Sequence, residues 1–556
     1  MISVKSLQGK LQTALSDLGL GSELSELVQT RRNLRRMTRL VTADERDVRI
    51  WFTGLNEVFE GSHLEDYPEG YKQAIQAPWP QPSPHAPSEL PPSVLHVPEA
   101  EVTEFLKQVV ARYVSTLKSD WIDALVFAHR RGKLREMSDA RFAEVFLTSP
   151  MGKSLTPVLE ADDQEFLSLF ALENQIQGSV WKVDFSLVEG IELLPQMSLE
   201  PTVAYFLREG HSSRMKPLAI RVRQAGFLPT SSRSDQGEQG DKYQLIRSRA
   251  AWVTAKQMTL QAAAVTLIAS AHPVVHFPMD AINAITKTVL AVGHPLREML
   301  LPHCYMQLPL NFAVLYIDRS VAHNHQREIY SAFPTTRRGF FELMKRGYSG
   351  YQGRPTFPHY QFKLGSPSIP TPYGDFLNQY YQPILNFART VCSGLDSRDA
   401  EVRRWWESLY RVLPGVPSPP LADEPLDLEQ VAQIAATFVH NCAVVHSADH
   451  HCYAKLPIDQ VPLRMRVGAD DMISSGGFVL PKEKIRKSDL FRHRMAWKMY
   501  FRPTTIRALP DVDYAFSDPL HRDAARKFHA DLRQLDRSLD GEKYIHLSQI
   551  ASSIQY

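Results

Sequence analysis

The sequence predicts a mainly α protein with a few short strands. Its 556 residues, 44% apolar and 22% charged, have the composition of a globular protein that can bury a large core. Apolar residues recur every three or four positions through most of the chain, which is typical of amphipathic helices. The strand-like stretches lie between about 180 and 225, notably "TVAYFLREG" and "KPLAIRVRQ", so we expect the strands there and helices elsewhere.

Two regions differ in composition along the chain. The first seventy residues carry helical patterning, as in "SELSELVQTRRNLRRMTRLV". They are followed by the proline-rich stretch 77–98, "APWPQPSPHAPSELPPSVLHVP", which favours an extended connector. We therefore expect a helical arm and connector over residues 1–100, and a larger helical domain over residues 101–556.

Charge and hydropathy exclude several classes of protein. The 63 basic and 61 acidic residues are spread along the chain and give a net charge of +2, so a nucleic-acid partner is not expected. The N-terminus lacks the apolar core of a secretory signal, and no run of eighteen apolar residues follows, so we expect no integral membrane segment. The four cysteines form no CxxC motif. The sequence thus predicts a cytoplasmic protein.

Two pairs of histidines stand four residues apart, His272 with His276 and His446 with His450. About 0.7 such pairs are expected by chance from 20 histidines in 556 residues. Side chains four apart share one face of a helix, so two facing helices could bring four imidazoles to one metal ion. The alternative is that each pair consists of hydrogen-bonded core histidines, which is what we expect for His294 and His303.

The four imidazole donors restrict which metal ions could bind. Imidazole suits iron, manganese, copper or zinc better than calcium or magnesium. Because a hydrolytic zinc ion usually keeps three protein ligands and an open position, four histidines fit a six-coordinate redox metal better. Pro273 directly follows His272 and disfavours a regular α-helix at that point. We therefore expect a kink or a helix start at His272.

Several collinear motifs resemble the lipoxygenase family. The segment "HPLREMLLPH" at 294–303, with Asn311 after it, resembles the family's HPxxxLLxPHxxxxxxxN, and "WVTAK" at 252–256 resembles its W-x-x-A-K. "CAVVHSADHH" at 442–451 resembles CSxxHAAVNF, and the ending "QIASSIQY" resembles GIPNSISI. The matches run from roughly Asp139 to the end. The resemblance implies a lipoxygenase-like catalytic domain over 101–556, without the family's N-terminal β-barrel and with the metal between two long central helices.

The resemblance also implies a site. The cofactor would be iron, with manganese as the alternative because the four-residue spacing of the first pair occurs in the manganese-using fungal branch. The family's H-Q-L and x-L-A-R patterns are replaced here, which indicates a rebuilt substrate pocket. The implied metal ligands are His272, His276, His446, His450 and the terminal carboxylate of Tyr556, and the implied substrate-binding residues are Leu267, Ile268, Val314 and Leu315.

The implied activity is that of a non-heme metal dioxygenase. Such an enzyme removes hydrogen from a C–H bond flanked by two double bonds and adds O2, most simply to a polyunsaturated fatty acid to give a hydroperoxide. The expected partners are thus a small apolar substrate and O2. Two alternatives stay open: an oxygenase acting on another intermediate of specialised metabolism, and a pseudoenzyme that keeps the fold as a scaffold.

Overall fold

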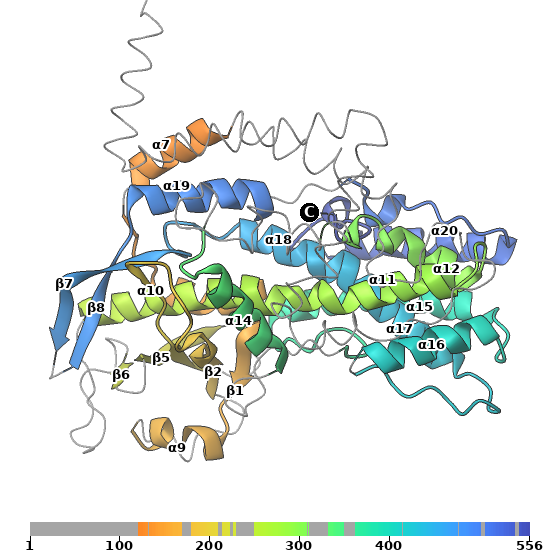
Figure 1. Ribbon diagram of the computed structural model, residues 1–556, viewed down its shortest axis with the longest axis horizontal. Helices are drawn as coiled ribbons and strands as arrows, with labels where there is room; N and C mark the ends of the chain where they lie inside the picture. Colours follow the sequence, from red (N-terminus) through yellow and green to blue (C-terminus); the bar gives the residue numbers. More distant parts are fainter. Residues whose placement is uncertain are drawn as a thin grey trace, which may run out of the picture.

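The computed structural model describes residues 120–131, 133–169, 180–208, 214–222, 226–229, 249–308, 310, 332–349, 362–413, 415–475, 478–501, 506–539 and 544–555 (Figure 1). The expected arm and connector over residues 1–100 lie outside these ranges. The described part is mainly helical, as the sequence predicts. Its α-helices are α7 (Trp121–Arg131), α8 (Asp139–Thr148), α9 (Glu160–Leu169), α10 (Arg249–Thr266), α11 (Phe277–Val289), α12 (Pro295–Leu300), α14 (Arg337–Ser349), α15 (Pro372–Ser393), α16 (Ala400–Val412), α17 (Leu428–Val439), α18 (His446–Ala454), α19 (Lys487–Ala496) and α20 (Pro519–Ser538).

A small antiparallel sheet confirms the strands expected between 180 and 225. Its order is β1-β2-β4-β5-β6, with "TVAYFLR" in β4 and "KPLAIRV" in β5. These two strands are almost wholly buried because the sheet packs against α8 and α10. The strands of this sheet are β1 (Leu155–Pro157), β2 (Val180–Asp184), β4 (Thr202–Arg208), β5 (Met215–Val222) and β6 (Gly226–Pro229).

The expectation that strands would be confined to about 180–225 is wrong. β3 (Met197–Ser198) pairs with β7 (Met465–Ser475), which forms a hairpin with β8 (Phe478–Lys484) at the left of Figure 1. The segment "MRVGADDMISS" of β7 contains a glycine and two aspartates, which are depleted in strands. Its pairing with β8 and β3 therefore outweighs the local preference of its residues.

One long helical stretch forms the axis of the molecule. Residues Arg249–Lys287 form one long helical stretch with a change of winding near its middle, and α10 and α11 run through the middle of Figure 1 on either side of that change. By length and hydropathy alone it could cross a membrane, but its most apolar part is 89% buried inside the protein. Burial on most sides explains why the stretch is largely apolar, with buried side chains such as Lys256, Gln261 and Asp280 as exceptions.

The second half of the chain wraps a helical core around α11. Helix α15 packs against α17 and α20, and α16 packs against α11. Side-chain caps fix where these helices begin. Asp399 accepts hydrogen bonds from the first-turn amides of α16, and Asp427 does the same for α17. The indole of Trp405 donates a 2.9 Å hydrogen bond to Thr286 and so ties α16 to α11.

The last described residues form a buried tail. Ala551 to Gln555 are inaccessible to solvent, although the segment has no regular secondary structure beyond one isolated β-bridge between Ala551 and Ala508. The side-chain oxygen of Gln555 accepts hydrogen bonds of 2.9 Å from the amides of Ile506 and Arg507. The tail therefore has its polar groups satisfied by the chain around it, as a buried irregular segment must.

Candidate metal centre

The first histidine pair lies where the central helix changes its winding. The α-helical turns of α10 give way to a π-helical turn, Leu267–Ala271, and then to a 3₁₀ turn, His272–Val275. Pro273 lacks the amide hydrogen that a continuing helix needs, so the predicted break at His272 is confirmed. The change of winding rotates the two imidazoles relative to their positions on a uniform α-helix.

The second pair is arranged in a similar way. A π-helical turn, His440–Val445, connects α17 to α18, and His446 is the first residue of α18. His450 follows one α-helical turn later and lies on the same face. Each pair thus comes directly after a π-helical turn, and such turns occur frequently at functional sites.

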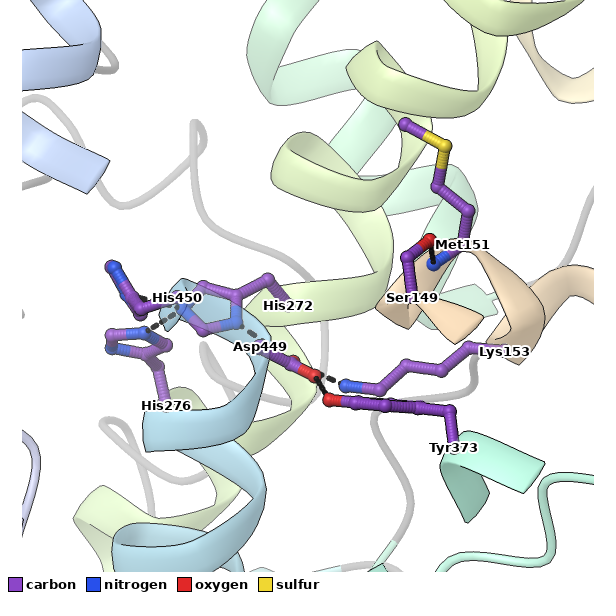
Figure 2. Close-up of polar contacts among 8 residues, drawn as sticks. All are labelled: Ser149, Met151, Lys153, His272, His276, Tyr373, Asp449 and His450. Atoms are coloured by element: carbon purple, nitrogen blue, oxygen red, sulfur yellow. Dashed lines mark hydrogen bonds and ion pairs between the residues drawn. The ribbon is translucent and has the colours of Figure 1, made fainter. Parts of the chain in front are cut away.

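The structure brings the four histidines together. One ring nitrogen from each of His272, His276, His446 and His450 lies within 4.8 Å of the other three. The Nε2 atom of His272 is 2.8 Å from Nε2 of His276 and 3.0 Å from Nε2 of His450 (Figure 2). His446 is inaccessible to solvent, and His276 and His450 are nearly so. Four imidazoles from two helices therefore converge on one point.

The proton positions distinguish a metal site from a set of core histidines. The Nδ1 atom of His272 lies 3.0 Å from a carboxylate oxygen of Asp449, so this nitrogen carries the proton and donates it. In a neutral ring, Nε2 of His272 then has only a lone pair. As core histidines, His276 and His450 would both have to donate to that single lone pair. A metal ion shared by the converging nitrogens fits this donor set better.

Burial favours the neutral form of two of these rings, His272 and His446, and neutral imidazole is the form that binds metal. It lowers the pKa of His272, although the hydrogen bond to Asp449 opposes the shift. Burial also lowers the pKa of His446 well below its usual value, and the neighbouring histidines add to the effect. The cluster therefore offers lone pairs at neutral pH.

A second layer of polar residues supports the first pair. Asp449 is buried between the ligand candidates of α18 and receives hydrogen bonds from Lys153 and from the hydroxyl of Tyr373, the latter at 2.7 Å (Figure 2). The sequence reasoning missed these three residues. The charge of Asp449 within "HSADHH" was a usable signal, whereas Lys153 and Tyr373 lie 296 and 76 positions away along the chain.

The two other histidines of the 271–303 segment are structural, as expected. Nδ1 of His294 caps α12, and its Nε2 lies 3.2 Å from Asp399. Nδ1 of His303 donates a 2.6 Å hydrogen bond to the carbonyl of Ser552, and its Nε2 accepts one from Tyr514. The His303 bond joins the segment to the buried tail.

The remaining predicted site residues fall into two groups. Leu267 and Ile268 lie on the π-helical turn before His272 and are buried in an apolar cluster that also contains Phe340, Tyr453 and Phe501. The other three, Val314, Leu315 and Tyr556, lie outside the described residues. Ile554 and Gln555 are the residues nearest to Tyr556 in the described chain, and both are fully buried.

Known structures share this architecture, although sequence comparison finds no relative. No protein-family model matches the chain, and no curated protein matches it in sequence. A coral 8R-lipoxygenase superposes with a TM-score of 0.59 at 16% identity, covering 88% of this chain and 80% of that one. A lipoxygenase in complex with arachidonate gives 0.57 at 15% identity, covering 88% and 81%. A 9R-lipoxygenase from Cyanothece gives 0.56 at 12% identity, covering 86% and 75%. The chain therefore has the lipoxygenase fold.

Proposed function

We propose that the protein is a non-heme metal dioxygenase that oxygenates a polyunsaturated fatty acid to a hydroperoxide. The observation that carries the proposal is the convergence of four imidazoles within 4.8 Å inside a lipoxygenase fold. Iron is the proposed metal and manganese the alternative, because imidazole ligands suit both. A redox metal bound there would supply the electron acceptor for removing hydrogen from an activated C–H bond.

The chain's own residues would hold the metal and line its surroundings with apolar side chains. His272, His276, His446 and His450 would be the ligands, with the carboxylate of Tyr556 as a fifth. Phe501 lies beside His450 with its ring centroid at 6.4 Å, and Tyr453 packs edge-on against Phe501 at 5.1 Å. These rings extend the apolar cluster of Leu267 and Ile268 toward the metal. An apolar wall suits a hydrocarbon substrate, since it offers no polar group that competes for the chain.

The fatty acid is the proposed substrate for two reasons. Buried apolar side chains adjoin the histidine cluster, and one structure with the same fold was determined with arachidonate. We assign Leu267, Ile268, Val314 and Leu315 to the substrate pocket, where each differs from the pattern that the resemblance implies. These differences would select which fatty acid, or which carbon of it, is oxygenated.

Metal analysis combined with O2 uptake tests the proposal. The purified protein should hold about one iron or manganese ion per chain and consume O2 with at least one polyunsaturated acid, giving a conjugated diene hydroperoxide. A saturated acid of equal length is the matched control, since it has no C–H bond between two double bonds. Metal-loaded protein that consumes no O2 with any such acid contradicts the fatty-acid proposal and favours another substrate. Protein without bound metal supports the scaffold alternative.

A further inference from the structure

We propose that Asp449 is a positioning residue for the metal centre: its buried carboxylate, held by Lys153 and Tyr373, fixes the imidazole of His272 and makes that ligand a stronger electron donor. This inference rests on the proposed metal site and goes beyond it. The pattern CSxxHAAVNF has valine where this chain has Asp449, so the carboxylate is a feature of this sequence.

The carboxylate joins four separate parts of the fold. Asp449 lies on α18 between His446 and His450, and its Oδ2 accepts the 3.0 Å hydrogen bond from His272 on the other ligand-bearing helix. Lys153 comes from the short helix before β1 and pairs with the same oxygen. Oδ1 accepts the hydroxyl proton of Tyr373 from α15. Both carboxylate oxygens are therefore used.

Burial gives the arrangement its strength. The side chains of Asp449 and Lys153 are 2% and 6% exposed, so water cannot screen the pair. The ammonium of Lys153 and the hydroxyl of Tyr373 both face the carboxylate of Asp449 and stabilise its negative charge. A buried carboxylate without such partners would be costly. The carboxylate therefore stays ionised next to His272.

An ionised acceptor at Nδ1 changes what Nε2 can do. As Nδ1–H is drawn toward the carboxylate, electron density on the ring rises and Nε2 becomes a more basic ligand. A more basic ligand stabilises the trivalent metal over the divalent metal. The same bond holds the ring plane so that Nε2 points to the cluster. Asp449 would thus raise metal affinity and lower the metal's reduction potential.

The test compares the wild type with Asp449→Asn in a Lys153→Met background. Asparagine keeps an oxygen that can accept from His272, while the charge is lost, and Lys153→Met avoids an unpaired buried cation. The potential of the iron-loaded protein is measured by redox titration followed by electron paramagnetic resonance. The affinity of the metal-free protein for Co²⁺ is measured by competition with a chelator. In the variant, the preference of the site for the trivalent over the divalent metal should fall roughly tenfold, so the reduction potential should rise by about 59 mV. Its affinity for Co²⁺ should fall roughly 10- to 100-fold.

Tyr373→Phe gives a test of sign. Removing the Tyr373 hydroxyl leaves Asp449 with one donor fewer, so its oxygens become stronger acceptors for His272. The potential should therefore fall, opposite to the rise in the Asp449→Asn and Lys153→Met protein. A merely structural role would not produce shifts of opposite sign.

The chain contains a matched control. Asp163 is also a buried carboxylate that pairs with a lysine, Lys182 at 2.6 Å, and accepts from a tyrosine, Tyr205 at 3.0 Å. No histidine bond to Asp163 occurs in the part of the chain that the structure covers. Asp163→Asn with Lys182→Met should therefore cost folding stability but leave the potential and the Co²⁺ affinity at wild-type values.

The outcomes separate this inference from the proposed function. If the Asp449 variant keeps the wild-type potential and Co²⁺ affinity while the wild type is an active oxygenase, the role of Asp449 is overturned and the proposed function stands. Shifts of the expected sign in a protein that oxygenates no fatty acid support the role and contradict the function. Equal shifts in the Asp163 control would mean that the shifts come from lost folding stability and not from the bond to His272. A wild type that binds neither iron nor Co²⁺ would overturn both the role of Asp449 and the proposed function.

Discussion

The backbone amide of Ala551 donates a 2.9 Å hydrogen bond to the hydroxyl of Ser447, the residue directly after His446. The tail is thus fastened to the helix that carries two of the four histidines. A second bond, from Ser553 to the carbonyl of Tyr305 at 2.7 Å, holds the tail on its other side. This path supports the proposal that the carboxylate of Tyr556 reaches the metal.

Extending the chain after Tyr556 should therefore abolish oxygenase activity. Even two or three added residues would replace the carboxylate by a neutral amide, in a chain whose last described residue, Gln555, is fully buried. O2 uptake and metal content are measured, with circular dichroism to show that the fold is kept. The same residues added before Met1 serve as the control. An active, metal-loaded protein with the C-terminal extension would remove Tyr556 from the proposed ligands.

Removing one ligand should empty the site. His276→Ala or His446→Ala leaves three imidazoles and a hole at the metal, so bound iron or manganese should fall from about one per chain to near zero. His440→Gln is the matched control. That histidine is also fully buried and donates from Nε2 to the carbonyl of Leu377 at 2.8 Å, but it lies outside the cluster. Full metal occupancy in both alanine variants would contradict the assignment of these histidines as ligands.

Acid should destabilise the metal-free protein through its buried neutral histidines. Burial lowers the pKa of His303 and of His440 to about 4. The unfolded chain, with a histidine pKa near 6.5, binds more protons than the folded chain between pH 6.5 and 4. Stability is therefore fully present above pH 6.5 and is lost as the pH falls toward 4. As the pH falls from 6.5 to 5, each histidine should lower the free energy of unfolding by about 2 kcal/mol.

Urea unfolding at a series of pH values measures this loss. In His303→Gln or His440→Gln protein, one titrating group is gone, so the free energy of unfolding should fall less steeply between pH 6.5 and 5. His129, at the exposed end of α7, is the control, and His129→Gln should keep the wild-type slope. Equal slopes in all the proteins would mean that neither buried histidine controls acid stability.

Val314 should restrict which carbon is oxygenated, because the x-L-A-R pattern of the resemblance has alanine where this chain has the bulkier Val314. Val314→Ala or Val314→Gly removes methyl groups and should change the ratio of positional or mirror-image hydroperoxides, with little effect on bound metal. Chiral chromatography of the products measures the ratio. Val292→Ala, at a side chain that is 61% exposed, is the control. An unchanged ratio in both Val314 variants would exclude Val314 from the oxygen path.

Local patterns in the sequence were enough to predict the helices and the sheet around β4 and β5, and to select the four histidines as metal ligands. The spacing of His272 with His276 and of His446 with His450 is a property of the chain itself, as is the break that Pro273 imposes. These features depend on neighbours within one or two turns, which is the range over which backbone geometry and side-chain spacing act. The β7–β8 hairpin was missed because it forms through pairing between strands, against the local preference of its own residues.

The tertiary structure alone decided how the four rings are held. No local pattern links Lys153, Tyr373 and Asp449, which meet because the short helix before β1, α15 and α18 pack around one buried carboxylate. The same packing brings the tail against Ser447. Ion pairs and hydrogen bonds of this kind join residues far apart in the sequence, and their strength depends on the exclusion of water, which exists only once the core has formed. The sequence therefore determined which residues could bind a metal, and the folded core decided their proton positions and their supporting charges.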